Sequence, residues 1–154
     1  MKWNKIIVSF FFLFVAMKIV NAQTTADLNL VGPDMVNANT TFTLDIKATN
    51  IKEGYLMTAG GHILSSNQDC ISLTKLESVA PGLSNNNTFA YSLGSGMNTD
   101  FVIAKATFEV HNNSCSSMIS IDKPKLAFTN NTRLSLENIT KNIQVLSLED
   151  VKIN

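Results

Sequence analysis

The stretch FVIAKATFEV, residues 101–110, decides the fold, because it is the longest run in the chain that alternates with period 2. Such alternation is typical of a β-strand. One face is predicted to point into the core and carries Val102, Ala104, Ala106, Phe108 and Val110. The other face carries Phe101, Ile103, Lys105, Thr107 and Glu109. Because this second face begins apolar and ends polar, we predict a central strand that is partly covered on its second side.

The same alternation recurs along most of the chain. Residues 42–48 and 89–93 repeat it, and further candidate strands are 27–31, 55–64, 71–79, 118–121, 125–129, 132–136 and 142–148. Clusters of Gly, Pro and Asn separate these segments, and no helical period lasts longer than two turns. The sequence therefore predicts an all-β protein, an antiparallel β-sandwich or jelly roll of about eight to ten strands. The pair Gly60-Gly61 predicts a bulge or a close backbone approach.

The N-terminal segment MKWNKIIVSFFFLFVAMKIVNA, residues 1–22, has the pattern of a cleaved signal peptide. Lys2 and Lys5 precede an apolar run over residues 6–17, and Ala22 offers a small residue at the cut. A membrane span is the competing interpretation, but this run is shorter than the roughly 20 apolar residues that cross a bilayer. We expect a secreted, extracellular protein with one domain over residues 23–148 and a short polar tail over 149–154.

The two cysteines, Cys70 and Cys115, are predicted to form a disulfide, because an even pair in an oxidising compartment is most simply bridged. Neither cysteine has the spacing of a zinc ligand, and the two histidines, His62 and His111, lack it as well. No calcium-binding loop is present either. We therefore expect no metal and no cofactor.

Catalysis and nucleic-acid binding have little support in the sequence. The carboxylates are scattered, no spacing marks any pair as catalytic, and no G-x-S-x-G nucleophile motif occurs. Cleavage after residue 22 would remove three of the 12 basic residues and none of the 12 acidic ones, which leaves a mildly acidic chain without a basic stripe. The expectation is a protein that is not an enzyme and does not bind nucleic acid.

Two features of the sequence concern glycans: possible attachment sites and possible sugar-binding aromatic residues. Five N-x-S/T sequons lie in or beside predicted turns, as glycan acceptors must, and begin at Asn39, Asn86, Asn112, Asn130 and Asn138. Exposed aromatic rings are the usual platform for binding sugar rings, yet the single Trp, Trp3, lies in the predicted signal peptide. Tyr55 and Tyr91 remain as possible platforms, and both fit ordinary half-buried strand positions.

The order of segments resembles the cohesin-like domains of the carbohydrate-binding β-sandwich superfamily. The resemblance rests on a short strand at 27–31, a turn, and a strand at 41–50 that leads to an Asn-containing loop. It continues through 101–110, 118–121 and 126–129 and ends with a closing strand at 143–145. It implies a non-catalytic sandwich whose partner contacts the face of Phe101, Ile103, Lys105, Thr107 and Glu109.

These observations favour a secreted non-catalytic binding module that recognises an extracellular protein or glycan. The alternative is a structural or adhesive protein of the cell surface or extracellular matrix. The two differ in behaviour: capture of one soluble partner favours the first, and self-association favours the second.

Export can be tested on the natural protein. Mass spectrometry of the extracellular form should find an N-terminus near Gln23, because the signal peptidase reads the small residues before that position. An intact chain that begins at Met1 and stays in the cytosol would contradict this prediction.

Overall fold

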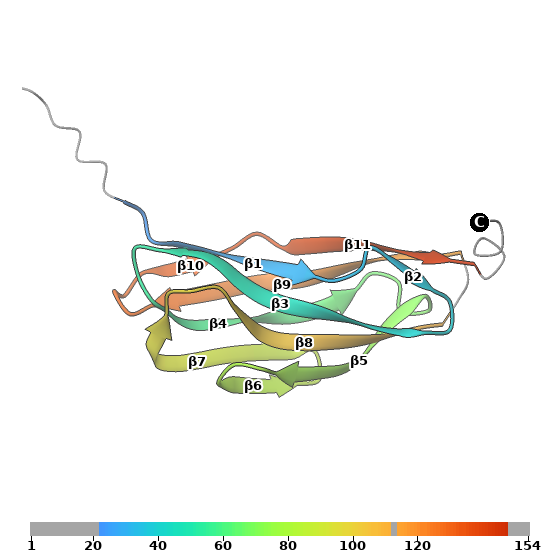
Figure 1. The fold of residues 1–154 in the computed structure, drawn as a ribbon, viewed down its shortest axis with the longest axis horizontal. Helices are drawn as coiled ribbons and strands as arrows, with labels where there is room; N and C mark the ends of the chain where they lie inside the picture. The colour runs from blue at the N-terminus through green and yellow to red at the C-terminus, as the bar shows by residue number, and fades with distance from the viewer. Residues whose placement is uncertain (1–21, 112–113, 148–154) are drawn as a thin grey trace, which may run out of the picture.

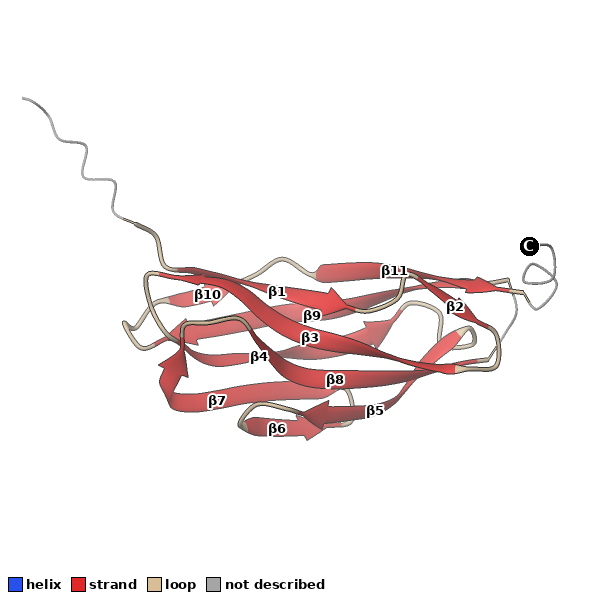
Figure 2. Cartoon of the chain, viewed as in Figure 1, coloured by secondary structure: helices blue, strands red, loops and turns tan. Residues whose placement is uncertain are grey.

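The computed structural model describes residues 22–111 and 114–147, and within them the chain forms eleven strands in two facing sheets (Figures 1 and 2). The predicted all-β sandwich is confirmed. The predicted signal peptide, apart from Ala22, lies outside the described residues, as do Asn112 and the tail at 149–154. None of the described residues belongs to a helix long and apolar enough to cross a membrane.

One sheet has four strands in the order β1-β3-β8-β5, and all of its pairs are antiparallel. Its strands are β1 (Thr25–Val31), β3 (Thr41–Lys52), β8 (Phe101–Val110) and β5 (Ile71–Ser78). The central position predicted for residues 101–110 is confirmed, because β8 pairs with β3 on one side and β5 on the other.

The second sheet has seven strands in the order β2-β11-β9-β4-β7-β6, with β10 paired to β9. Its strands are β2 (Met35–Asn37), β11 (Ile139–Leu146), β9 (Ser116–Phe128), β4 (Leu56–Ser65), β7 (Thr88–Met97), β6 (Gly82–Asn85) and β10 (Arg133–Ser135). Its pairs are antiparallel except for β2 with β11, which is parallel.

The strand number differs from the predicted eight to ten for local reasons. β2 and β6 lie in segments that the sequence marks as turns, and each is held by one neighbouring strand. The segments predicted at 118–121 and 125–129 are one continuous strand, β9. Pro124 does not interrupt β9. It lies opposite the register shift between Gly60 and His62 of β4, and such an irregularity is a position where a strand tolerates a residue without a backbone N–H.

The core fills the space between the two sheets. Phe42 and Phe108 stack within the four-stranded sheet, with ring centroids 5.3 Å apart. Tyr91 of β7 contacts Phe101 of β8 across the sandwich, with ring centroids 4.9 Å apart. The largest fully buried side chains come from both sheets: Tyr91, Phe89, Phe108, Phe128, Leu44, Ile46, Leu56, Ile63, Ile71, Ile103, Ile119 and Ile121.

A β-bulge at Ile103 corrects the faces predicted for the first residues of β8. Ala104 pairs with Ile46 but Val102 pairs with Lys47, so Ile103 is the extra residue. A bulge shifts the alternation by one position. Phe101 therefore points inward onto Tyr91, and Ile103 is only 2% exposed, although both were predicted on the outer face.

The bulge predicted at Gly60-Gly61 is confirmed by the register shift between β4 and β9. A Cβ on Gly61 would stand 2.7 Å from Cγ2 of Ile121. Glycine is required here because the backbone of β4 lies directly against a core side chain of β9.

The disulfide between Cys70 and Cys115 is present, with the two Cα atoms 6.1 Å apart. Cys70 directly precedes β5, and Cys115 directly precedes β9. The bond therefore joins the four-stranded sheet to the seven-stranded sheet at one end of the sandwich. The predicted disulfide is confirmed.

Residues 107 and 108 give a matched test of the sandwich. Phe108 is completely buried, so Phe108→Ala should lower the free energy of unfolding by about 3 to 5 kcal/mol. Thr107 points outward and only shares a hydroxyl contact with Thr43, so Thr107→Ala should change it by less than about 0.5 kcal/mol. Denaturant unfolding measures both, and equal effects would contradict the assigned faces.

The disulfide gives a second stability test. Replacing Cys70 and Cys115 together by Ala should lower the free energy of unfolding by about 2 to 5 kcal/mol, because the cross-link restrains a long loop in the unfolded chain. Reduced wild-type protein is the control and should lose a similar amount. Unchanged stability in both would contradict a bond between the sheets.

Candidate functional site

The outward face of the four-stranded sheet carries charged side chains of both signs, and two pairs of them are in contact. Asp45 of β3 and Glu77 of β5 lie opposite Lys105 of β8, on its two sides. Lys105 Nζ is 3.8 Å from Asp45 Oδ1, and Lys75 Nζ is 2.7 Å from Glu77 Oε1. We call this surface the charged face; its residues are Asp45, Lys75, Glu77, Lys105 and Glu109.

The structure separates the five residues predicted to contact a partner. Lys105, Thr107 and Glu109 lie on the outward side of β8, with Lys105 and Glu109 exposed. Phe101 and Ile103 do not join them, because the bulge turns both toward the core. The predicted surface is therefore shorter and more polar than the sequence indicates.

The outward face of the seven-stranded sheet is different, because toward one edge its strands β4, β7 and β6 carry uncharged residues. Leu83 of β6 pairs with Ala90 of β7, and Ala90 pairs with Gly60 of β4. Leu83 is 78% exposed. Thr58 and Ser92 pair beside them. We call this surface the uncharged face; its residues are Thr58, Gly60, Leu83, Ala90 and Ser92.

A polar border surrounds part of the uncharged face. His62 lies opposite Thr88 and Asp122, and Lys125 lies opposite Gly60. The ring nitrogen Nδ1 of His62 is 2.9 Å from the hydroxyl of Thr88. An uncharged centre with a polar rim is the usual anatomy of a protein interface. Alternation along the chain does not reveal this surface, because it depends on the register of the β6–β7 hairpin and on the pairing of β7 with β4.

Tyr91 is a core residue rather than a sugar platform. It is 2% exposed, and its hydroxyl donates to the carbonyl of Leu56 at 3.3 Å. Burial raises the pKa of Tyr91 above its ordinary value. Tyr55, by contrast, is 48% exposed.

One pair with possible chemistry was not visible in the sequence. Ser72 Oγ and His111 Nε2 are 2.7 Å apart, although the two residues are 39 positions apart in the chain. Antiparallel pairing of β5 with β8 places them together, and the backbone N–H of His111 donates to the carbonyl of Cys70. Among the described residues, no carboxylate hydrogen-bonds the His111 ring, so the contact is that of a surface hydroxyl and an imidazole. Nor do three His, Cys, Asp or Glu side chains gather anywhere in the described part as a metal site.

The sequons occupy different environments. Asn39 and Asn86 lie in turns with left-handed backbone, at φ 57° and 51°. The amide of Asn130 donates to the hydroxyl of Thr24 and the carbonyl of Glu53. Asn138 accepts a hydrogen bond from the backbone of Lys123. Glycosylation at any of them stays a prediction.

No protein-family model matches this sequence, and no curated protein matches it. Solved structures do match its fold. A cohesin module from a Clostridium perfringens family 33 glycoside hydrolase superposes with a TM-score of 0.67 at 12% identity, covering 81% of this chain and 99% of that one. A type I cohesin–dockerin complex from Clostridium thermocellum gives 0.63 at 10% identity, covering 80% and 100%.

A non-cellulosomal cohesin from the archaeon Archaeoglobus fulgidus is also similar, with a TM-score of 0.57 at 10% identity over 84% of this chain and 96% of that one. At such low identity the likeness concerns the fold alone. The chain has a cohesin-like β-sandwich fold.

Proposed function

We propose that this protein is a secreted, non-catalytic binding module that recognises an extracellular protein through its uncharged face. The observation that carries the proposal is the Leu83–Ala90–Gly60 row of that face, which runs inward from the edge strand β6 and begins with the highly exposed Leu83. Similar solved structures include cohesins in complex with dockerins, which are protein partners. The N-terminal signal pattern and the disulfide support an extracellular location.

The uncharged face suits a protein partner better than the charged face does. Covering it removes apolar surface from water, which is favourable, and leaves no charge unpaired in its centre. Covering the charged face would dehydrate Lys105 and its neighbour Asp45, which already contact each other, together with the exposed Glu109. Lys105, Thr107 and Glu109 remain the alternative surface.

Two pairs of substitutions distinguish the surfaces. The first joins Leu83→Asp to Ala90→Asp, which places two carboxylates at the centre of the uncharged face. The second reverses charge at Lys105→Glu and Glu109→Lys. All four side chains are exposed, so both variants should fold. Each change places like charges opposite one another on paired strands, at Leu83 and Ala90 in the first and beside Asp45 and Glu77 in the second, so a modestly lower thermal midpoint should accompany both.

The immobilised full chain should capture a partner from the native extracellular medium, and that partner, once purified, is titrated by calorimetry. We expect the first pair to weaken binding at least about tenfold, a loss of about 1.4 kcal/mol or more, because carboxylates are then buried without partners. The charge-reversed pair should bind like the wild type. If the charge-reversed pair lost affinity and the first pair did not, binding would be assigned to the charged face. If no partner were captured and the chain self-associated in sedimentation, the structural or adhesive alternative would be favoured.

A further inference from the structure

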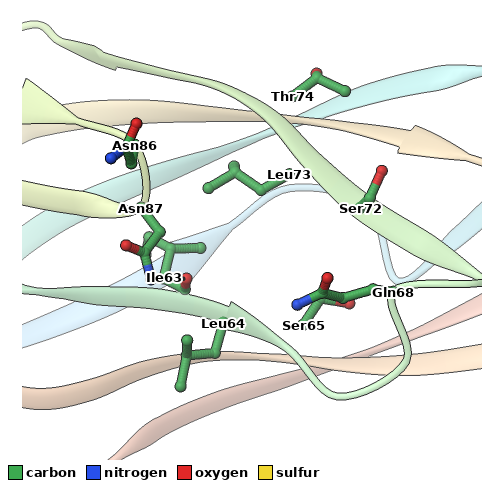
Figure 3. A pocket seen from close by; sticks show the side chains of 9 residues that line it. All are labelled: Ile63, Leu64, Ser65, Gln68, Ser72, Leu73, Thr74, Asn86 and Asn87. Carbon is green, nitrogen blue, oxygen red and sulfur yellow. Dashed lines mark hydrogen bonds between the residues drawn. The ribbon is translucent and has the colours of Figure 1, made fainter.

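A cleft opens at one end of the sandwich, between the end of β4, the start of β5 and the turn that joins β6 to β7 (Figure 3). Its volume is about 410 Å³. It is lined by Ile63, Leu64, Ser65, Gln68, Ser72, Leu73, Thr74, Asn86 and Asn87. It shares no residue with the uncharged face.

The lining combines amides and hydroxyls with an apolar floor, and it contains no charged side chain. Gln68 and Asn86 come from opposite sides, with Leu73 between them (Figure 3). Within the described residues, neither of these two amide side chains makes a hydrogen bond. Asn87 donates only one amide hydrogen, to the carbonyl of Ile63, so its amide oxygen also stays open.

This chemistry matches a neutral sugar. An amide offers a donor and an acceptor side by side, and neighbouring hydroxyls on a sugar ring present the complementary pair. The apolar face of the ring can lie on Leu73. Charged ligands would find no counter-charge in this lining, and the volume lies toward the lower end of ligand sites, which are roughly 300 to 1,000 Å³.

An extended peptide fits less well. A peptide would add to the free edge of β5, but a register shift at Thr74 interrupts that edge. Farther along, Ser84 Oγ donates to the carbonyl of Leu76 and occupies the edge there. Bulges and covered edges are features that oppose strand addition.

We propose that, in the chain without a glycan at Asn86, this cleft binds a neutral oligosaccharide, with Gln68 and Asn86 holding the hydroxyls of a ring that rests on Leu73. The cleft is separate from the uncharged face. It can therefore exist whether or not the proposed function holds.

Nuclear magnetic resonance of the isotope-labelled full chain tests the proposal. The probes are the neutral tetrasaccharides of β-linked glucose, α-linked glucose, xylose, mannose and N-acetylglucosamine, each at roughly 10 mM, which detects a millimolar Kd. Protein from a bacterial periplasm is used, so that Asn86 carries no glycan. At least one sugar should shift the side-chain amide signals of Gln68 and Asn86, with a saturable dependence on concentration.

The matched variants are Gln68→Ala with Asn86→Gly against Asn142→Ala. Glycine suits position 86 because its φ is 51°. Asn142 is another exposed amide, on β11. The first pair should raise Kd at least tenfold, and the control should leave it unchanged.

Three outcomes would overturn the proposal. One is the absence of shifts with every sugar, and another is an equal loss of affinity in Asn142→Ala. The third is that an uncharged Ser/Thr/Val hexapeptide shifts the backbone amides of β5 while no sugar shifts the amides of Gln68 and Asn86, which would make the cleft a peptide groove.

Discussion

The structure depends on the packing of two inner sheet faces around one apolar layer. Phe101 on the four-stranded side meets Tyr91 of β7 on the other, and Phe42 and Phe108 stack on each other within the four-stranded sheet. Because a strand turns every second side chain to the same face, this layer fixes which residues point to solvent. The outward residues do not contribute to the core, so they are free to differ between the two sheets. The disulfide adds one covalent link between the sheets at the end where the cleft opens.

The two outward faces carry different kinds of side chain. One carries charged side chains, two pairs of which are in contact, and the other carries small side chains beside Leu83. Both faces are built on the same kind of strand, and only the outward residues distinguish them. Under the proposed function, recognition depends on the composition of the surface, and the cleft is a separate polar feature at the end of the sandwich.

Much of this architecture could be predicted from the sequence. Period-2 alternation predicted the all-β class and the central place of β8, and the cysteine pair predicted the disulfide. The bulge at Ile103 could not be predicted, because residues 101–104 are all apolar and fit either face. The register with β3 decides between them. The uncharged face and the Ser72–His111 contact were also missed, because both depend on strand register. The face requires the pairing of β6, β7 and β4, and the contact requires the pairing of β5 with β8.

Hydroxyl-radical footprinting of the chain with and without its purified partner tests the central claim most directly, because it measures the exposure of individual side chains. In the free chain Leu83 and Val31 should both be oxidised, being 78% and 47% exposed. The account predicts that the partner protects Leu83 and leaves Val31, which lies opposite Asp45 beside the charged face, unchanged. Protection of Val31 with no change at Leu83 would contradict it.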